Sequence, residues 1–98
     1  MLLTAELLAR PIDVAKQATR RPRAFRVARW QAEHGAIVTS LRHEGIRIDE
    51  PEGRAILAAA DGTRDRAALA ARLGGRADAA GIVDHFLARF AYTGLIEA

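Results

Sequence analysis

One stretch of the chain repeats its apolar residues with the period of an α-helix, and this repeat constrains the fold more than any other feature. Six apolar side chains fall at spacings that place them on one helix face: Ala79, Ile82, Val83, Phe86, Leu87 and Phe90. Such a stripe is typical of a helix with one face in a protein core. The sequence therefore predicts a core helix that starts at Asp78 and is closed by Gly94, since glycine tolerates the left-handed backbone of a helix end.

The length of the chain limits this core to one domain. Chains use about 100 to 200 residues for each domain, and this one has 98. Cysteine is absent, which excludes disulfides and thiolate metal sites and fits a reducing compartment. No apolar run approaches the roughly 20 residues of a membrane-spanning helix, and the first residues lack the features of a signal peptide. We therefore expect a soluble, cytoplasmic protein that does not enter a membrane.

Two short segments before the core helix have the composition of β-strands. Residues 37–41 are rich in β-branched side chains, and residues 46–48 alternate apolar with polar. Glu44–Gly45 lies between them and supplies a residue that tolerates the positive φ of a tight turn, so the sequence predicts a β-hairpin. Just before it, residues 24–34 predict a helix that Gly35 closes with a left-handed backbone.

Two further helices are predicted between the hairpin and the core helix. Asp49 can cap the first, because its carboxylate can accept from free backbone amides, and Pro51 suits the first helical turn. This helix ends at the Asp61–Gly62 turn, after which Thr63 can cap the second helix. Gly74–Gly75 then closes the second helix.

The basic residues gather at the amino-terminal end. Residues 1–30 contain seven basic and two acidic groups, a balance of +5, whereas residues 31–98 contain eight basic and ten acidic groups, a balance of −2. The basic character therefore belongs to an arm and less to the globular part.

The arm is predicted to be helical. Its apolar side chains share one helix face: Leu3, Leu7 and Leu8. Arg20–Arg23 interrupts the pattern with like charges and a proline, as linkers do. We assign residues 1–22 to an N-terminal helical arm and basic linker, and residues 23–98 to the domain. The predicted fold is α+β: a winged-helix-like domain with a short β-hairpin, three core helices and the N-terminal helical arm, with Leu95–Ile96 as a terminal strand beside the hairpin.

The residues that catalyse reactions or bind metals form no recognisable constellation. The histidines lie in three different predicted elements, without the i, i+4 spacing of two ligands on one helix: His34, His43 and His85. The one serine, Ser40, falls inside a predicted strand, and the glycines match neither the phosphate-binding loop nor the dinucleotide motif. The only lysine is Lys16.

A group of carboxylates leaves two interpretations open. Asp49, Glu50 and Glu52 could act in acid–base chemistry, but their place at a predicted helix start favours a role as helix-capping charges. We predict no catalytic residue, no cofactor and no metal, and hence a binding protein instead of an enzyme.

Winged helices are common in DNA-binding proteins, so nucleic acid is an alternative partner. The predicted exposed residues of the core helix do not suit phosphates or base edges: Asp78, Asp84, His85 and Arg89. On the second helix, acidic neighbours partly neutralise the arginines Arg64, Arg66 and Arg72. The basic segment 20–29, with Phe25 inside it and Trp30 directly after it, is the better candidate. We nevertheless expect both rings to pack against the domain.

Three pieces of the sequence carry a family resemblance. Residues 37–44, 46–50 and 61–66, in this order, resemble the winged-helix-like segment that follows the regulatory domain in bacterial S-adenosylmethionine-dependent protein lysine methyltransferases. The resemblance covers about half of the chain, within residues 23–73, and Gly45 stands where it leads us to expect proline. It implies an accessory module without the catalytic domain or cofactor site, and transfers no catalytic residue.

Charged residues of the arm and the hairpin form the candidate interaction surface: Arg20, Arg21, Arg23, Arg42, His43, Glu44 and Arg47. We expect Arg42 and Arg47 on facing strands, where they pair with Glu44 or Asp49 or else meet an acidic peptide. The predicted partner is a protein or peptide, in a module that regulates a methyltransferase or presents substrate to it. An extended peptide would bind the hairpin edge and the arm would dock to a larger partner. Nucleic-acid binding and self-association through the leucines of the arm are the alternatives.

Overall fold

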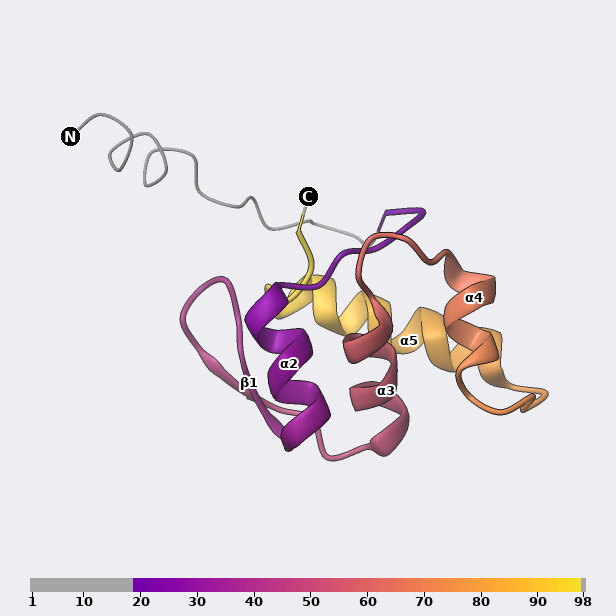
Figure 1. Ribbon diagram of the computed structural model, residues 1–98, viewed down its shortest axis with the longest axis horizontal. Helices are drawn as coiled ribbons and strands as arrows, with labels where there is room; N and C mark the ends of the chain where they lie inside the picture. Colours follow the sequence, from indigo (N-terminus) through magenta and orange to yellow (C-terminus); the bar gives the residue numbers. More distant parts are fainter. Residues whose placement is uncertain (1–18, 98) are drawn as a thin grey trace.

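Four helices and one β-hairpin make up the part of the chain that the computed structural model describes, residues 19–97. Their order is α2 (Arg26–His34), β1 (Ile37–Thr39), β2 (Gly45–Arg47), α3 (Pro51–Ala59), α4 (Arg66–Ala71) and α5 (Ala79–Tyr92). The hairpin and α4 lie at opposite ends of the domain, with α2 and α3 between them (Figure 1). The predicted α+β winged-helix fold is confirmed. Most of the predicted arm, with Leu3, Leu7 and Leu8, falls outside the described residues, so the arm and its boundary at residue 22 stay predictions.

The apolar stripe of α5 lies in the core, as its period predicts. Val83, Phe86, Leu87 and Phe90 are buried, and Ile82 is half-buried against them. α5 packs against α3 and α4, and α2 packs against α3 and β1. The core therefore lies where the helices pack against one another, and the hairpin covers one end of it.

Gly53 lets α3 approach α5 closely. A Cβ atom at this position would stand 2.6 Å from Cε1 of Phe86 and 2.9 Å from Cγ2 of Ile48. All three residues are buried, with Ile48 fully so. Any side chain larger than hydrogen at Gly53 would have to displace core residues.

The hairpin is confirmed, but its turn differs from the prediction. β1 and β2 are antiparallel, with Thr39 opposite Gly45. Ser40 follows the strand instead of lying in it, and its buried hydroxyl accepts from the amides of Arg42 (3.1 Å) and Glu44 (3.2 Å). The positive φ of 61° falls at His43, because Gly45 already belongs to β2. The loop is organised around a buried hydroxyl, which the prediction of a short glycine turn missed.

Two predicted N-caps are wrong by one or two residues. Glu50, and not Asp49, precedes α3, where Pro51 takes the first helical position as predicted. Asp65 caps α4 by accepting from the amide of Ala68 at 2.9 Å. Thr63 lies two residues before the N-cap position, and its hydroxyl and its amide both donate to Asp61 in the preceding turn.

Of the predicted glycine helix ends, the one at Gly94 is confirmed: it follows the C-cap of α5 with a positive φ. The 74–75 pair also has positive φ values, but α4 already ends at Ala71, three residues before it. Gly35 has φ 175°, an extended backbone, so the predicted left-handed end of α2 is wrong. β1 begins two residues later, at Ile37, and an extended Gly35 leads the chain directly into it.

The C-terminal segment pairs with the start of the domain and not with the hairpin. Phe25 N donates to Leu95 O at 3.0 Å, and Glu97 N donates to Arg23 O at 2.8 Å. Only Gly94 meets the hairpin, where its carbonyl accepts from Leu41 N at 2.8 Å. The predicted terminal strand beside the hairpin is therefore wrong, because the segment that enters α2 takes the backbone groups of residues 95–97.

Asp61 accepts hydrogen bonds within the turn between α3 and α4, and its ionisation should make the stability of the fold depend on pH. Hydrogen bonds from the Thr63 hydroxyl and amide, with the Arg64 guanidinium 2.9 Å away, lower the pKa of Asp61 to about 2. The pKa in the unfolded chain is about 3.9. Because the folded value is the lower one, the carboxylate stabilises the fold above pH 4, and this contribution disappears as pH falls toward 2.

We therefore expect Asp61→Asn to be less stable than the unmodified chain at pH 6, with the difference shrinking between pH 4 and pH 2. Urea unfolding followed by circular dichroism at pH 6, 4 and 2.5 measures this. Thr63→Val removes the strongest donor and should move the acid transition upward. If the free energies of unfolding of Asp61→Asn and of the unmodified chain changed in parallel with pH, Asp61 would not be the group responsible for the acid dependence.

Candidate interaction surface

The structure divides the seven predicted surface residues between two places. The segment before α2 is held to the α4 side, because Arg66 Nη1 donates to Thr19 O at 3.0 Å. Among the described elements α4 packs only against α3 and α5, and the hairpin lies at the far end of the domain (Figure 1). Arg20 and Arg21 are exposed in the first group, and Arg23 is joined to Glu97 at 3.4 Å. The predicted residues thus do not form one continuous surface.

Within the hairpin group, Arg42 and Arg47 do not face each other as predicted. Arg42 lies in the loop, where its Nη1 donates to Tyr92 O at 2.8 Å and its side chain lies against Gly94. Arg47 lies opposite Ile37 and pairs with its own neighbour Asp49 at 3.1 Å. Arg42 lies outside the strands because the loop starts at Ser40. It ties the hairpin to the end of α5, and the pairing within the fold is made by Arg47.

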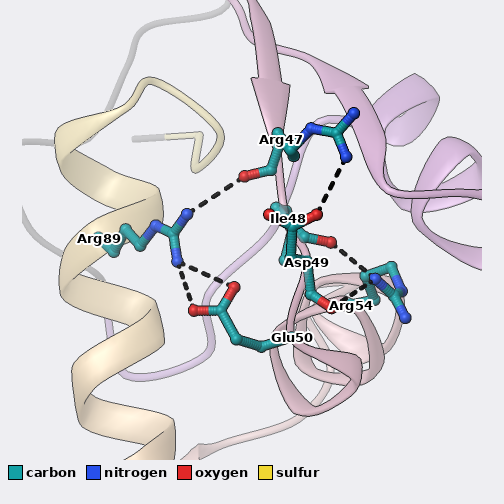
Figure 2. A network of polar contacts seen from close by, with 6 residues as sticks. All are labelled: Arg47, Ile48, Asp49, Glu50, Arg54 and Arg89. Atoms are coloured by element: carbon teal, nitrogen blue, oxygen red, sulfur yellow. Dashed lines mark hydrogen bonds and ion pairs between the residues drawn. The ribbon is translucent and has the colours of Figure 1, made fainter.

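The exit of β2 is fixed by arginines that bridge it to two helices (Figure 2). Arg89 on α5 reaches Glu50 at 3.1 and 3.3 Å and the carbonyl of Arg47 at 3.2 Å. Arg54 on α3 donates to the carbonyls of Ile48 at 2.7 Å and Asp49 at 3.0 Å. Charge-assisted hydrogen bonds of this kind hold the hairpin in one orientation on α3 and α5.

The same network accounts for the carboxylates near residue 50. Glu50 meets Arg89, Asp49 meets Arg47, and Glu52 lies 3.9 Å from Arg76. Each acid therefore has an arginine beside it, which favours the interpretation of the group as structural charges.

The two edges of the hairpin differ in what covers them. In the observed register, the N–H and C=O groups of Ile37, Thr39, Gly45 and Arg47 point away from the partner strand. On β1 the side chain of Gln31 closes this edge, since its Oε1 accepts from Thr39 N at 2.7 Å and its Nε2 donates to Thr39 Oγ1 at 3.2 Å. No other described strand or helix runs alongside β2, although the Ile46 side chain packs on the core. Of the two edges, the one formed by β2 is the more open: the carbonyl of Arg47 accepts from Arg89, but the N–H and C=O groups of Gly45 and the N–H of Arg47 have no partner among the described residues.

The two aromatic rings before the hairpin have different surroundings. Phe25 is half-buried against the core, as predicted. Trp30 is 61% exposed and stacks on His34 with ring centroids 4.1 Å apart, so its predicted packing against the domain is wrong. The sequence contained the signal: Ala28 and Ala32 form the buried side of α2, and Trp30 lies two residues from each, roughly 200° around the helix.

The histidines stay apart, as their spacing predicts. His34 stacks on Trp30, His85 lies edge-on to Phe86 at 5.1 Å, and His43 is at the exposed hairpin tip. Residues 19–97 contain no group of three metal-binding side chains. Over the same range, no helix is long and apolar enough to cross a membrane.

Comparison with known proteins now identifies this arrangement of helices and hairpin. Residues 20–83 match the family described as PKMT, C-terminal winged helix domain. The chain belongs to this family. The family resemblance predicted from the sequence is therefore confirmed, and so is the fold that it implied.

Solved structures agree on the fold of this C-terminal winged helix domain. PKMT2 from Rickettsia typhi in complex with AdoHcy superposes with a TM-score of 0.77 at 18% identity, covering 87% of this chain and 22% of that protein. A second structure of PKMT2 from Rickettsia typhi gives a TM-score of 0.69 at 20% identity, with the same coverage. This chain thus spans about a fifth of the length of these relatives. A search of curated proteins gave no match.

Proposed function

We propose that this winged helix domain is a non-catalytic interaction module that works with a protein lysine methyltransferase and binds an extended segment of its partner along β2. The open edge of β2 is the observation that carries the proposal. An exposed edge strand offers backbone N–H and C=O groups to an added strand, a common mode of peptide recognition. The other edge is closed by Gln31, so a partner strand has one place to add.

The surroundings of this edge suit a docking site. The arginine network holds β2 in a fixed orientation, so an incoming strand meets a pre-formed edge and loses less free energy on ordering. The hairpin tip presents Arg42, His43 and Glu44 in exposed positions beside it, where they can contact side chains of the partner. Gly45 keeps an N–H that the proline expected from the family resemblance would lack.

The catalytic step belongs to the partner in this proposal. The module matches only the C-terminal domain of its relatives, and neither its three histidines nor its carboxylates assemble a reaction centre within the described residues. The cytoplasmic location and the docking role of the arm are parts of the same proposal. The lack of cysteine supports the location, and the basic charge before residue 30 supports the docking role.

A proline at the open edge tests the proposal. The N–H of Gly45 points away from β1, so Gly45→Pro should leave the hairpin ladder intact and remove a donor from the docking edge. We expect the tagged full chain to capture a protein lysine methyltransferase from cells of the source organism, and Gly45→Pro to recover at least about tenfold less of it. The exposed residue Arg72, at the end of α4, provides the control variant Arg72→Ala.

Mass spectrometry identifies the captured proteins, and circular dichroism checks that each variant is folded. Equal capture by Gly45→Pro would exclude strand addition at β2. Captured proteins that include no methyltransferase would exclude the accessory role.

A further inference from the structure

A second surface, on the outer side of α2, exposes large apolar side chains. It consists of Val27, Trp30, His34 and Ile37, and we call it the α2 aromatic face. Val27 is 47% exposed, Trp30 61% and Ile37 52%. Contiguous exposed apolar side chains of this size are characteristic of binding surfaces, because removing them from water lowers the free energy of the system.

This face is rigid before anything binds to it. The Trp30 ring is stacked on His34, and His34 Nδ1 lies 2.7 Å from the carbonyl of Trp30, which fixes the stack. Gln31 joins α2 to β1 through its two hydrogen bonds with Thr39. A partner therefore orders few side chains on docking, and fixed aromatic residues are the usual centres of binding energy at interfaces.

A shallow hollow of about 300 Å³ opens between the end of α2 and the start of β1. Its lining is Trp30, Gln31, His34, Gly35, Ala36 and Ile37. This volume is at the lower end for small-molecule pockets, which are also more enclosed. The hollow suits an apolar side chain that projects from a partner protein.

The charges around the α2 aromatic face indicate what charge a partner segment should have. Arg26 lies one turn before Trp30 on the exposed side of α2, and no described carboxylate pairs with it. Arg29 lies about 100° around the helix from Trp30, outside the face, and its Nε donates to the carbonyl of Ala24 at 3.2 Å. The first turn of α2 contains no acidic residue, and Glu33 is the one acid on the helix. The amino-terminal rim of the face is therefore positive.

We propose that the α2 aromatic face docks an acidic segment of a partner protein, with an apolar side chain in the hollow beside Trp30 and a carboxylate on Arg26. This goes beyond the binding of an extended segment at β2, because β1 and the Gln31 side chain separate the two surfaces. The module would thereby contact two segments at once.

The same observations favour protein over nucleic acid as the occupant. A nucleic acid needs a continuous basic track for its phosphates. Arg20 and Arg21 follow Thr19, which is bonded to Arg66 of α4, and Arg23 is paired with Glu97, so these basic residues form no continuous track with Trp30. The apolar Ile37 and the acidic Glu33 at the other end of the face suit a polypeptide.

Fluorescence anisotropy with defined peptides tests the proposal on the full chain. The probe is a fluorescein-labelled peptide of alternating glutamate and leucine, compared with a lysine–leucine peptide of the same length, at physiological salt. We expect saturable binding of the acidic peptide only. Arg26→Glu and Trp30→Ala should each weaken it by at least about tenfold, as truncation of interface centres does.

Matched controls separate this site from general attraction to a basic protein. Arg72→Glu makes the same charge change on an exposed residue elsewhere, and Tyr92→Ala removes an exposed ring outside the face. Both should stay within about twofold of the unmodified chain. A Cβ at Gly45 would meet Ile37 Cγ2 at the ordinary contact distance of 3.9 Å and displace nothing, so Gly45→Pro should change this binding by less than about twofold.

Three results would overturn the proposal. The first is absence of saturable binding, or equal binding of the lysine–leucine peptide. The second is an equal loss in the variants of the face and in their controls. The third is selective binding of oligothymidylate, lost in Trp30→Ala and Arg26→Glu, without binding of the acidic peptide, which would identify nucleic acid as the occupant.

Discussion

Phe90→Ala is expected to lower the free energy of unfolding by about 3–5 kcal/mol, the usual cost of emptying a buried phenylalanine site. Phe90 is fully buried on α5, with its ring 5.7 Å from that of Phe86. Its carbonyl also accepts from Leu95 N, where the chain turns back toward α2. A domain of this size has only about 5–15 kcal/mol of stability, so the variant should be partly or wholly unfolded.

Urea unfolding followed by circular dichroism measures this loss, with Tyr92→Ala as the control. Tyr92 lies two residues further along the same helix and is 82% exposed, so its truncation should change stability by no more than about 0.5 kcal/mol. Similar losses in the two variants would mean that α5 does not bury the predicted face.

Gly53→Ala and Gly81→Ala are expected to change stability in opposite directions. Both glycines lie in helices, α3 and α5, where alanine is intrinsically better by about 0.5–1 kcal/mol. At Gly81 no atom lies within 4 Å of an added Cβ, so this gain should appear in full. At Gly53 the added Cβ would meet Phe86 at 2.6 Å, and overpacking of this kind costs about 1–3 kcal/mol.

Thermal and urea unfolding of the two variants, measured beside the unmodified chain, give the comparison. The intrinsic helix preference is the same at both sites, so the difference between them reports the contact of α3 with α5 alone. Stabilisation by Gly53→Ala would show that the two helices are further apart than the structure has them.

The helices and the hairpin could be predicted because each depends on local patterns. The stripe of α5, the β-branched run before Ser40, and the positive φ of Gly94 follow from residue spacing and glycine chemistry. The family resemblance was carried by the same segments and is confirmed by the match over residues 20–83.

The caps and the loop could not be predicted, since neighbouring residues compete for the same role. From the sequence, either Thr63 or Asp65 could cap α4. In the structure Thr63 is hydrogen-bonded to Asp61, and Asp65 caps the helix. Ser40 was taken as a strand residue, although its hydroxyl replaces a glycine turn by holding two amides of the loop. Hydrogen bonds between such close alternatives differ by about 1 kcal/mol or less, which a sequence pattern does not resolve.

The candidate surface was predicted in part because charge alone does not place residues in space. Arg20 and Arg42 were grouped by their charge, but Arg20 follows Thr19, which is bonded to α4, whereas Arg42 lies in the hairpin loop and is bonded to the end of α5. Trp30 was missed because its ring was expected to pack against the domain, although helix geometry places it opposite Ala28 and Ala32. A consistent use of the helical period would have found the α2 aromatic face.

The pairing of residues 23–25 with residues 95–97 makes the two extremities of the domain depend on each other. Fraying normally begins at a free end and spreads inward. Here neither segment can separate from the domain without breaking the backbone hydrogen bonds of Phe25 to Leu95 and of Glu97 to Arg23. It would also expose Ala24 and Ile96, which are completely buried. The segments 23–25 and 95–97 therefore unfold together, as one cooperative unit.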